Sequence, residues 1–291
     1  MAISTSDPVQ SYRERLPAPQ LANLVSSMWF LEVDAAAAAY EHRTVPNGSV
    51  EISYELGSDV VHVSGPQRGP TVVRVEPGAI LVGARLRPGA APSIVGAPIS
   101  ELVDLQVEAD RLWGGGAATL AVRLGEAGSP MGAARVLEED LVRRIAQAPV
   151  PDPLVSAAAG RLQPWIPHSV GARTADLFLS PRQLRRRFAA ALGYGPKTLQ
   201  RILRFQGFLA LAQGQHGTRV SLARLAQRAG YSDQAHLTRE SSGLTGLTPR
   251  AFLEEMWRSC GPTHDHAASF AGLRRALLSA RPPLVQQEWA A

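Results

Sequence analysis

The chain has one cysteine, Cys260, and one lysine, Lys197, among its 291 residues. A single cysteine cannot close a disulfide within the chain, which is typical of a protein from a reducing compartment. No apolar run approaches 18 residues, and no basic and apolar leader is present, so we expect neither a membrane span nor secretion. These absences predict a cytoplasmic protein. Because lysine is so scarce, nearly all the positive charge is arginine.

The charge is unevenly distributed along the chain. Residues 1–159 contain 12 arginines and 18 acidic residues, a net charge of −6, whereas residues 160–260 carry 15 basic and 5 acidic residues, a net charge of +10. A basic segment of this length is typical of proteins that bind a polyanion such as nucleic acid, although solvated arginines on helix surfaces would produce the same count. The apolar content of 45% is enough for buried cores, and the length suits two domains.

The first 113 residues read as β-rich, with short apolar stretches separated by glycine and proline turns. The expected strands are 25–33, 50–56, 60–63, 71–75 and 80–82. From Pro130 the apolar period changes to that of a helix ending near Gln147, with its apolar face at Val136, Leu137, Leu141, Val142 and Ile145. Three prolines follow in residues 149–153, where no helix can continue. We therefore expect a β-rich sensor domain at 1–148, a DNA-binding domain at 153–258 and a tail at 259–291.

The basic segment contains a helix with an arginine-rich face. Ser180 and Pro181 are a favourable helix start, and Gly193 is a favourable end. The residues expected to be buried lie four apart, at Leu184, Phe188 and Leu192. The opposite face carries Arg182, Gln183, Arg185 and Arg186, with Arg187 at its margin.

The same design recurs about 52 residues later. A short helix with Leu222, Leu225, Ala226 and Ala229 is followed by a turn at Gly230. Ser232 or Asp233 then caps a second helix, which exposes Gln234, Ala235, His236, Thr238 and Arg239. Two short helices joined by a tight turn form a helix-turn-helix unit, whose second helix fits a DNA major groove. A longer helix over 196–213 connects the two units, and Thr248-Pro249 starts a last helix.

These residues resemble the AraC family of transcription regulators. The matching stretches are 180–188, 193–196 with Arg204, 225–226, 230–231, Asp233, 236–239 and 246–249. The resemblance implies two helix-turn-helix units that read bases through Arg182, Arg185, Arg186, Gln234, Ala235, Thr238 and Arg239. We add Gln183, Lys197 and His236 as candidate DNA contacts. Gln234 and Arg239 suit either bases or phosphates, and His236 suits a structural or phosphate role better than base readout.

Five positions depart from the family pattern. Arg173 and Thr174 occupy places that are usually apolar, and Ser241 replaces a common buried phenylalanine. Phe178 stands where a turn glycine is usual, so a positive φ there would cost roughly 1 kcal/mol or more. Gly207 lies inside the connector, at a cost of about 1 kcal/mol relative to alanine. The second unit therefore has the better-supported fold.

The first half resembles the cupin-like sensor barrel of AraC-type regulators, through 12–14, 45–51, 83–89 and Glu101-Leu102. The expected fold class is thus α+β, a cupin-like barrel followed by an all-α domain. Candidate contacts to a small-molecule effector are Trp29, Tyr54, His62, Arg85 and Trp113, although each also suits a core or rim position. His42 and His62 are the only histidines before residue 168, which disfavours a metal-dependent cupin enzyme.

The tail contains Cys260, His264, Asp265 and His266, which suit a metal in chemistry but lack a spaced second pair. We therefore expect a polar loop there, no metal, no cofactor and no catalytic residues. The sequence predicts a DNA-binding transcription regulator, an activator or repressor, with double-stranded DNA and a small-molecule effector as partners. RNA polymerase would be a further partner of an activator, and a homodimer would form through the helix over 130–147. The alternatives are a cupin-type enzyme and a ligand-gated interaction module that no longer binds DNA alone.

Overall fold

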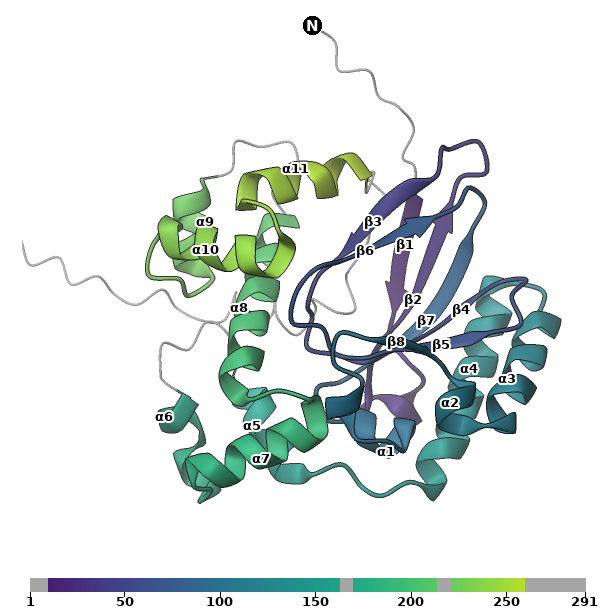
Figure 1. The fold of residues 1–291 in the computed structure, drawn as a ribbon, viewed down its shortest axis with the longest axis horizontal. Coiled ribbons are helices and arrows are strands. Elements are labelled where there is room, and N and C mark those ends of the chain that lie inside the picture. The colour runs from purple at the N-terminus through teal and green to yellow at the C-terminus, as the bar shows by residue number, and fades with distance from the viewer. Residues whose placement is uncertain (1–9, 163–169, 214–220, 260–291) are drawn as a thin grey trace, which may run out of the picture.

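The fold was determined as a computed structural model, which describes residues 10–162, 170–213 and 221–259. A β-rich N-terminal part and a helical C-terminal part pack against each other (Figure 1). The α+β class expected from the sequence is confirmed. The metal-ligand candidates of the tail, Cys260, His264, Asp265 and His266, lie outside the described residues. No described helix has the length and apolar character needed to cross a bilayer.

In the described residues, eight strands form two antiparallel sheets. The larger sheet has the order β1 (Gln10–Arg15), β2 (Val25–Val33), β7 (Ile80–Leu86), β4 (Glu51–Glu55), β5 (Val61–Ser64) and β8 (Gln106–Glu108). The smaller sheet pairs β3 (Tyr40–Thr44) with β6 (Thr71–Val75). In the part of the chain that the structure describes, β1 and β8 are edges that do not pair with each other. The expected barrel is therefore not closed.

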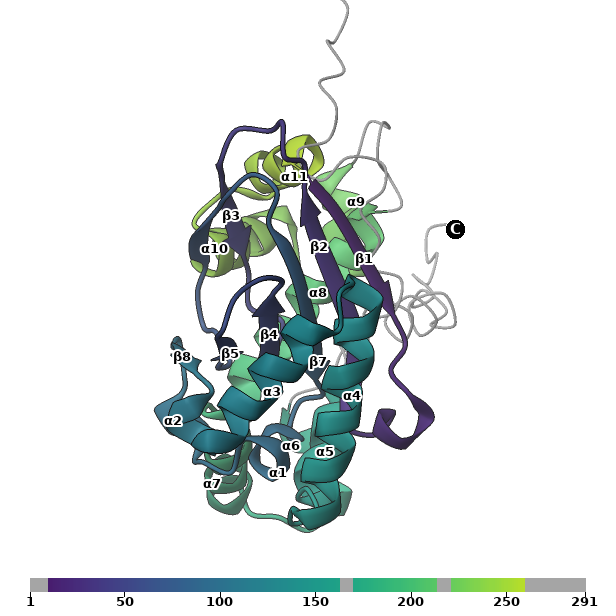
Figure 2. The same cartoon turned by 90° about the vertical axis from the view of Figure 1, so that its right-hand side faces the viewer.

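One face of the larger sheet packs against helices. Its alternate residues Met28, Phe30, Ile52, Tyr54 and Val82 are buried in the main N-terminal core. The helices around this core are α1 (Ala91–Val95), α2 (Asp110–Trp113), α3 (Gly115–Glu126) and α4 (Pro130–Gln147), and Figure 2 shows α3 and α4 lying across the sheet. Strand alternation therefore separates an apolar, helix-covered face from a second face that carries the polar residues described below.

Helix α4 has the expected ends and most of the expected buried face, since Leu137 and Leu141 are buried and Val136 and Ile145 pack against the core. Ser129 caps it by accepting a hydrogen bond from the Gly132 amide at 3.1 Å. The buried apolar residues are Ala133, Ala134, Leu137 and Leu141. Val142 is 37% exposed, so its expected burial was wrong. Small alanines on the facing side let the helix lie close to the sheet, and they displace the buried stripe away from Val142.

The C-terminal part is entirely helical among its described residues. Its helices are α5 (Pro153–Arg161), α6 (Val170–Thr174), α7 (Pro181–Leu192), α8 (Pro196–Gln213), α9 (Leu222–Arg228), α10 (Gln234–Thr245) and α11 (Pro249–Ser259). Helix α8 stands between α7 and the group formed by α9, α10 and α11 (Figure 1). Its residues Phe205 and Phe208 are fully buried and belong to the same core as Phe188 of α7 and Leu237 of α10. One continuous core therefore holds both units on the connector.

Candidate nucleic-acid interface

Helix α7 begins with a complete capping box. The Ser180 hydroxyl accepts a hydrogen bond from the Gln183 amide at 3.2 Å, and the Gln183 side chain accepts one from the Ser180 amide at 2.9 Å. These contacts pair two donors that a helix start leaves unsatisfied. The Gln183 side chain, a candidate DNA contact, is therefore occupied by the cap in this structure.

The arginines of α7 divide into two groups. Arg182, Arg185 and Arg186 are exposed, whereas Leu184 and Phe188 on the opposite side are buried. The Arg185 Nε donates to the Pro181 carbonyl at 3.2 Å. Arg187 is half-buried and pairs with Asp152 of the preceding linker at 2.5 Å. Three guanidinium groups are thus presented by the first two turns of α7.

The turn before α7 carries backbone strain. Phe178 has φ of 52° and is 92% exposed, at the place where the sequence pattern puts a glycine. The expected positive φ of Phe178 is confirmed. An L-residue with a bulky side chain pays a steric penalty in this region, and no packing of the ring offsets it. Thr174, at a place that is usually apolar, is buried, and its hydroxyl donates to the Val170 carbonyl at 2.9 Å.

Helix α10 begins at the second unit's turn. Asp233, one of the two expected caps, accepts a hydrogen bond from the His236 amide at 2.6 Å. This bond is the main cause that lowers the pKa of Asp233. The His236 ring contacts the Ser232 hydroxyl through Nδ1 at 3.1 Å and lies edge-on to Tyr231. The ring therefore helps to hold the turn, in line with the structural role that the sequence favoured.

The outer face of α10 carries the remaining candidates. Gln234, Ala235 and Arg239 are exposed, and Thr238 is half-buried with its hydroxyl donating to the Gln234 carbonyl at 2.9 Å. Asp233 caps the helix beside them, so its N-terminal turn combines a fixed backbone with free polar side chains. Such a helix start is suited to contact base edges in a major groove.

The connector α8 is tied to the second unit. Arg201 pairs with Glu240 of α10 at 2.7 Å, and the Arg204 guanidinium lies 5.6 Å from the centre of the Tyr231 ring. The helix runs unbroken through Gly207, so the expected weak point does not interrupt it. Lys197 is exposed near its start. Helices α7 and α10 are therefore held by one connecting helix.

Comparison with known proteins agrees with this arrangement. Residues 174–255 match a family described as a helix-turn-helix domain. The chain carries an AraC-type helix-turn-helix domain. This AraC-type domain contains α7 to α10 and most of α11. Residues 13–108 match a second family, described as a domain of unknown function (DUF6597). No curated protein matches the chain.

Solved structures of ToxT from Vibrio cholerae show a distant likeness. An apo variant has 8% identity and a TM-score of 0.41, covering 84% of this chain and 96% of that one. The wild-type protein with bound unsaturated fatty acid has 9% identity and a TM-score of 0.40, covering 87% and 97%. A third structure, from strain O395, has 8% identity and a TM-score of 0.40, covering 85% and 97%. Scores this low carry no conclusion about function.

The five expected effector contacts do not form one site. Trp29, His62 and Arg85 belong to the sheet face opposite the helices, by strand alternation. Tyr54 is in the apolar core on the other face, and its hydroxyl donates to the Ser58 carbonyl at 2.8 Å. Trp113 lies at the edge of that core, and its ring centre is 3.7 Å from the central carbon of the Arg144 guanidinium. Trp29 itself rests on Gly83, where an added Cβ would lie 2.3 Å from the indole.

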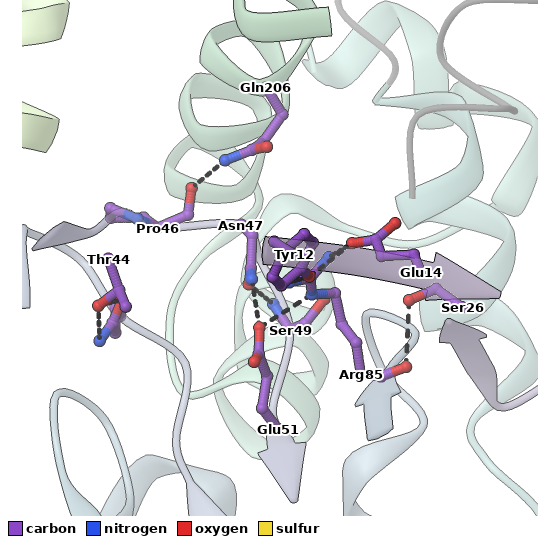
Figure 3. A network of polar contacts seen from close by, with 11 residues as sticks. Tyr12, Glu14, Ser26, Thr44, Pro46, Asn47, Ser49, Glu51, Arg85 and Gln206 are labelled. Atoms are coloured by element: carbon purple, nitrogen blue, oxygen red, sulfur yellow. Dashed lines mark hydrogen bonds and ion pairs between the residues drawn. The ribbon is translucent and has the colours of Figure 1, made fainter. Parts of the chain in front are cut away.

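A buried polar network centres on Arg85. Its guanidinium pairs with Glu14 at 2.7 Å and with Glu51 at 2.9 Å, and it donates to the Tyr12 hydroxyl at 3.1 Å (Figure 3). Burial alone would lower the pKa of Arg85, but the nearby Glu51, Tyr12 and Glu14 outweigh it and raise the pKa. Burial also raises the pKa of Tyr12, whose hydroxyl donates to Glu14 at 2.7 Å. Arg85 is therefore cationic and the Tyr12 hydroxyl neutral at neutral pH.

The network continues to the AraC-type domain. Glu51 accepts a hydrogen bond from the Asn47 side chain at 2.6 Å, and Asn47 accepts one from the Ser49 amide at 2.9 Å. In the same loop, the Pro46 carbonyl accepts a buried bond from Gln206 of α8 at 2.7 Å (Figure 3). Sequence reasoning named 45–51 as part of a resemblance but assigned no role to Glu14, Asn47, Glu51 or Gln206. Only the folded chain brings them together.

Proposed function

We propose that the protein is a transcription regulator that binds double-stranded DNA through α7 and α10 of its AraC-type domain, with a domain boundary in 149–152. The observation that carries the proposal is that two helices with well-capped N-terminal ends expose basic and amide side chains and are joined by one rigid connector. Arginine and glutamine recognise guanine and adenine edges through paired hydrogen bonds, and arginine also contacts phosphates. The proposed contacts are Arg182, Gln183, Arg185, Arg186, Lys197, Gln234, Ala235, His236, Thr238 and Arg239.

Binding assays with matched variants test this proposal. We expect Arg182→Ala and Arg239→Ala each to weaken specific binding by roughly 1–3 kcal/mol if the side chain contacts a base, and each phosphate contact to contribute about one unit of salt slope. Arg74→Ala is the control, because Arg74 is 72% exposed on β6, outside the proposed DNA contacts and the proposed dimer helix. A mobility-shift assay on sites selected from genomic fragments measures the effect. Equal affinity of wild type and both variants would refute the proposed contacts.

The N-terminal part is proposed to make this binding responsive to a small molecule. The hydrogen-bonded path from Arg85 through Glu51 and Asn47 reaches the loop that Gln206 of α8 holds. An effector that displaces Glu51 or Arg85 would disturb the loop and hence the connector that positions both recognition helices. Such coupling needs a different effector affinity in the two states, which is measurable as a change of DNA affinity.

A homodimer through α4 is a further proposal. Exposed apolar side chains on α3 and α4 support it, at Val122, Met131 and Val142. A dimer would place two AraC-type domains on one promoter, and RNA polymerase would be an additional partner if the protein activates transcription. Sedimentation should show a dimer at micromolar concentration that Val142→Arg dissociates. A monomer at all concentrations would argue against it.

A further inference from the structure

A pocket lies at the junction between the N-terminal part, the linker and α7. Its volume is about 530 Å³, within the range of small-molecule sites. Pro92 and Ser93 of α1, Pro149 and Val150 of the linker, and Arg186 and Ala190 of α7 line it. Three separate segments of the chain therefore build its walls, away from the Arg85 network.

The walls are apolar, and most of their polar groups are already satisfied. The Ser93 hydroxyl donates to the Pro149 carbonyl at 2.6 Å, which holds the linker against α1. Arg187 and Asp152 neutralise each other through their ion pair. Burial would raise the pKa of Asp152, but the hydrogen bonds from Arg187, Leu154 and Val155 outweigh it and lower the pKa, so this carboxylate is ionised.

Arg186 is the exception in this lining. Among the described residues it has neither a hydrogen bond nor an ion pair, so the pocket carries one uncompensated positive charge. Beside it, Val150 is 88% exposed, an apolar side chain with almost no packing. An unpaired guanidinium next to unpacked apolar surface is complementary to a ligand with an anionic head and an apolar body.

We propose that this junction pocket binds a small organic anion, whose carboxylate or sulfonate pairs with Arg186 and whose apolar body lies against Pro92, Val150 and Ala190. Anion binding in the pocket does not depend on the proposed function. Competition with DNA rests on the proposed function, because it requires that Arg186 of α7 also contacts DNA. Anion and DNA then compete for the same guanidinium. Each would then weaken the binding of the other by the same factor.

The test uses 8-anilinonaphthalene-1-sulfonate, which combines a sulfonate with an aromatic body and fluoresces in apolar surroundings. We expect one saturable site on the full-length protein. Arg186→Gln should weaken binding about tenfold, as loss of a charge-assisted hydrogen bond does. Ala190→Trp should abolish binding by filling the pocket.

Two matched variants serve as controls. Arg182→Gln and Ala189→Trp alter exposed residues of the same helix that do not line the pocket, so probe affinity should stay unchanged. Equal losses of probe affinity in the lining variants and in the controls would refute ligand binding in the pocket. Unchanged probe affinity in Arg186→Gln and Ala190→Trp would refute it as well. Probe binding with the expected pattern but no effect on DNA affinity would overturn only the competition. A protein that binds no DNA would refute the proposed function, and the titration would still decide the pocket.

Discussion

Individual polar side chains at helix ends determine which groups are left for recognition. Gln183, Asp233 and His236 each bond to the backbone or to a neighbour at the start of α7 or α10. They cap the helices whose first two turns carry the exposed Arg182, Arg186 and Arg239. The proposed contacts are therefore exposed side chains, and the residues beside them use their polar groups to cap the same helices.

Phe178 offers a test of strain at a single residue. Phe178→Gly should raise the free energy of unfolding by about 1 kcal/mol, because glycine adopts φ of 52° without a steric penalty. The ring is 92% exposed, so its removal sacrifices no packing. Denaturant unfolding measures the gain. Phe178→Ala is the control and should give none, because alanine keeps the penalty; equal behaviour of both variants would contradict the strain.

Asp152 offers a test of pH dependence. Its pKa is lowered in the folded state, so the stability it contributes is complete above its ordinary pKa of 3.8 and is lost as the pH falls through the folded-state value. Asp152→Asn should cost roughly 0.5–1 kcal/mol at neutral pH, because the ion pair is partly exposed, and the difference from wild type should shrink as the pH falls below 3.8.

Unfolding in urea at several pH values measures this difference. Asparagine keeps the cap of α5, whereas Asp152→Ala also removes it and should cost about 1 kcal/mol more. A difference between wild type and Asp152→Asn that stays constant with pH would show that the Arg187 pair contributes nothing.

Helix ends also decide how the elements pack. The C-terminal glycines of α7 and α10, Gly193 and Gly246, have φ of 77° and 76°. An added Cβ on Gly193 would lie 2.2 Å from a Val103 methyl group, whereas one on Gly246 would have nothing nearer than 3.8 Å. The end of α7 is thus seated against the N-terminal part, which positions the first recognition helix.

The two glycines form a matched pair of substitutions. Gly246→Ala should cost roughly 1 kcal/mol from the left-handed backbone alone. Gly193→Ala should cost clearly more, because the methyl group also displaces Val103. Thermal unfolding of both variants measures the contrast. Equal destabilisation would show that α7 does not rest on the N-terminal part in solution.

At the scale of the whole molecule, specific contacts join the two parts. Arg43 of β3 pairs with Glu255 of α11 at 2.7 Å and donates to the Thr245 carbonyl at 3.2 Å. Gln206 of α8 donates a hydrogen bond to the carbonyl of Pro46, two residues beyond the end of β3. These contacts join the N-terminal part to the connector and to the second unit.

Breaking these contacts should uncouple the two parts. We expect wild type to unfold in one calorimetric transition and Arg43→Ala with Gln206→Ala to unfold in two, because each part keeps its own core. Arg74→Ala with Glu76→Ala is the control, since that pair is 72% and 62% exposed on the surface. A single transition in the Arg43 and Gln206 double variant would place the coupling elsewhere.

The sequence alone determined the elements whose signals are local. Periodicity and caps predicted β2, β6, α4, α7, α8 and the start of α10, and the glycine pattern predicted the positive φ of Phe178, because hydrogen-bond and steric preferences act over a few residues. Only the tertiary structure decided which side chains meet. It left the barrel open, separated Tyr54 from Arg85, and joined Glu14, Glu51, Asn47 and Gln206. Such contacts link residues far apart in the chain, and local preference carries no information about them.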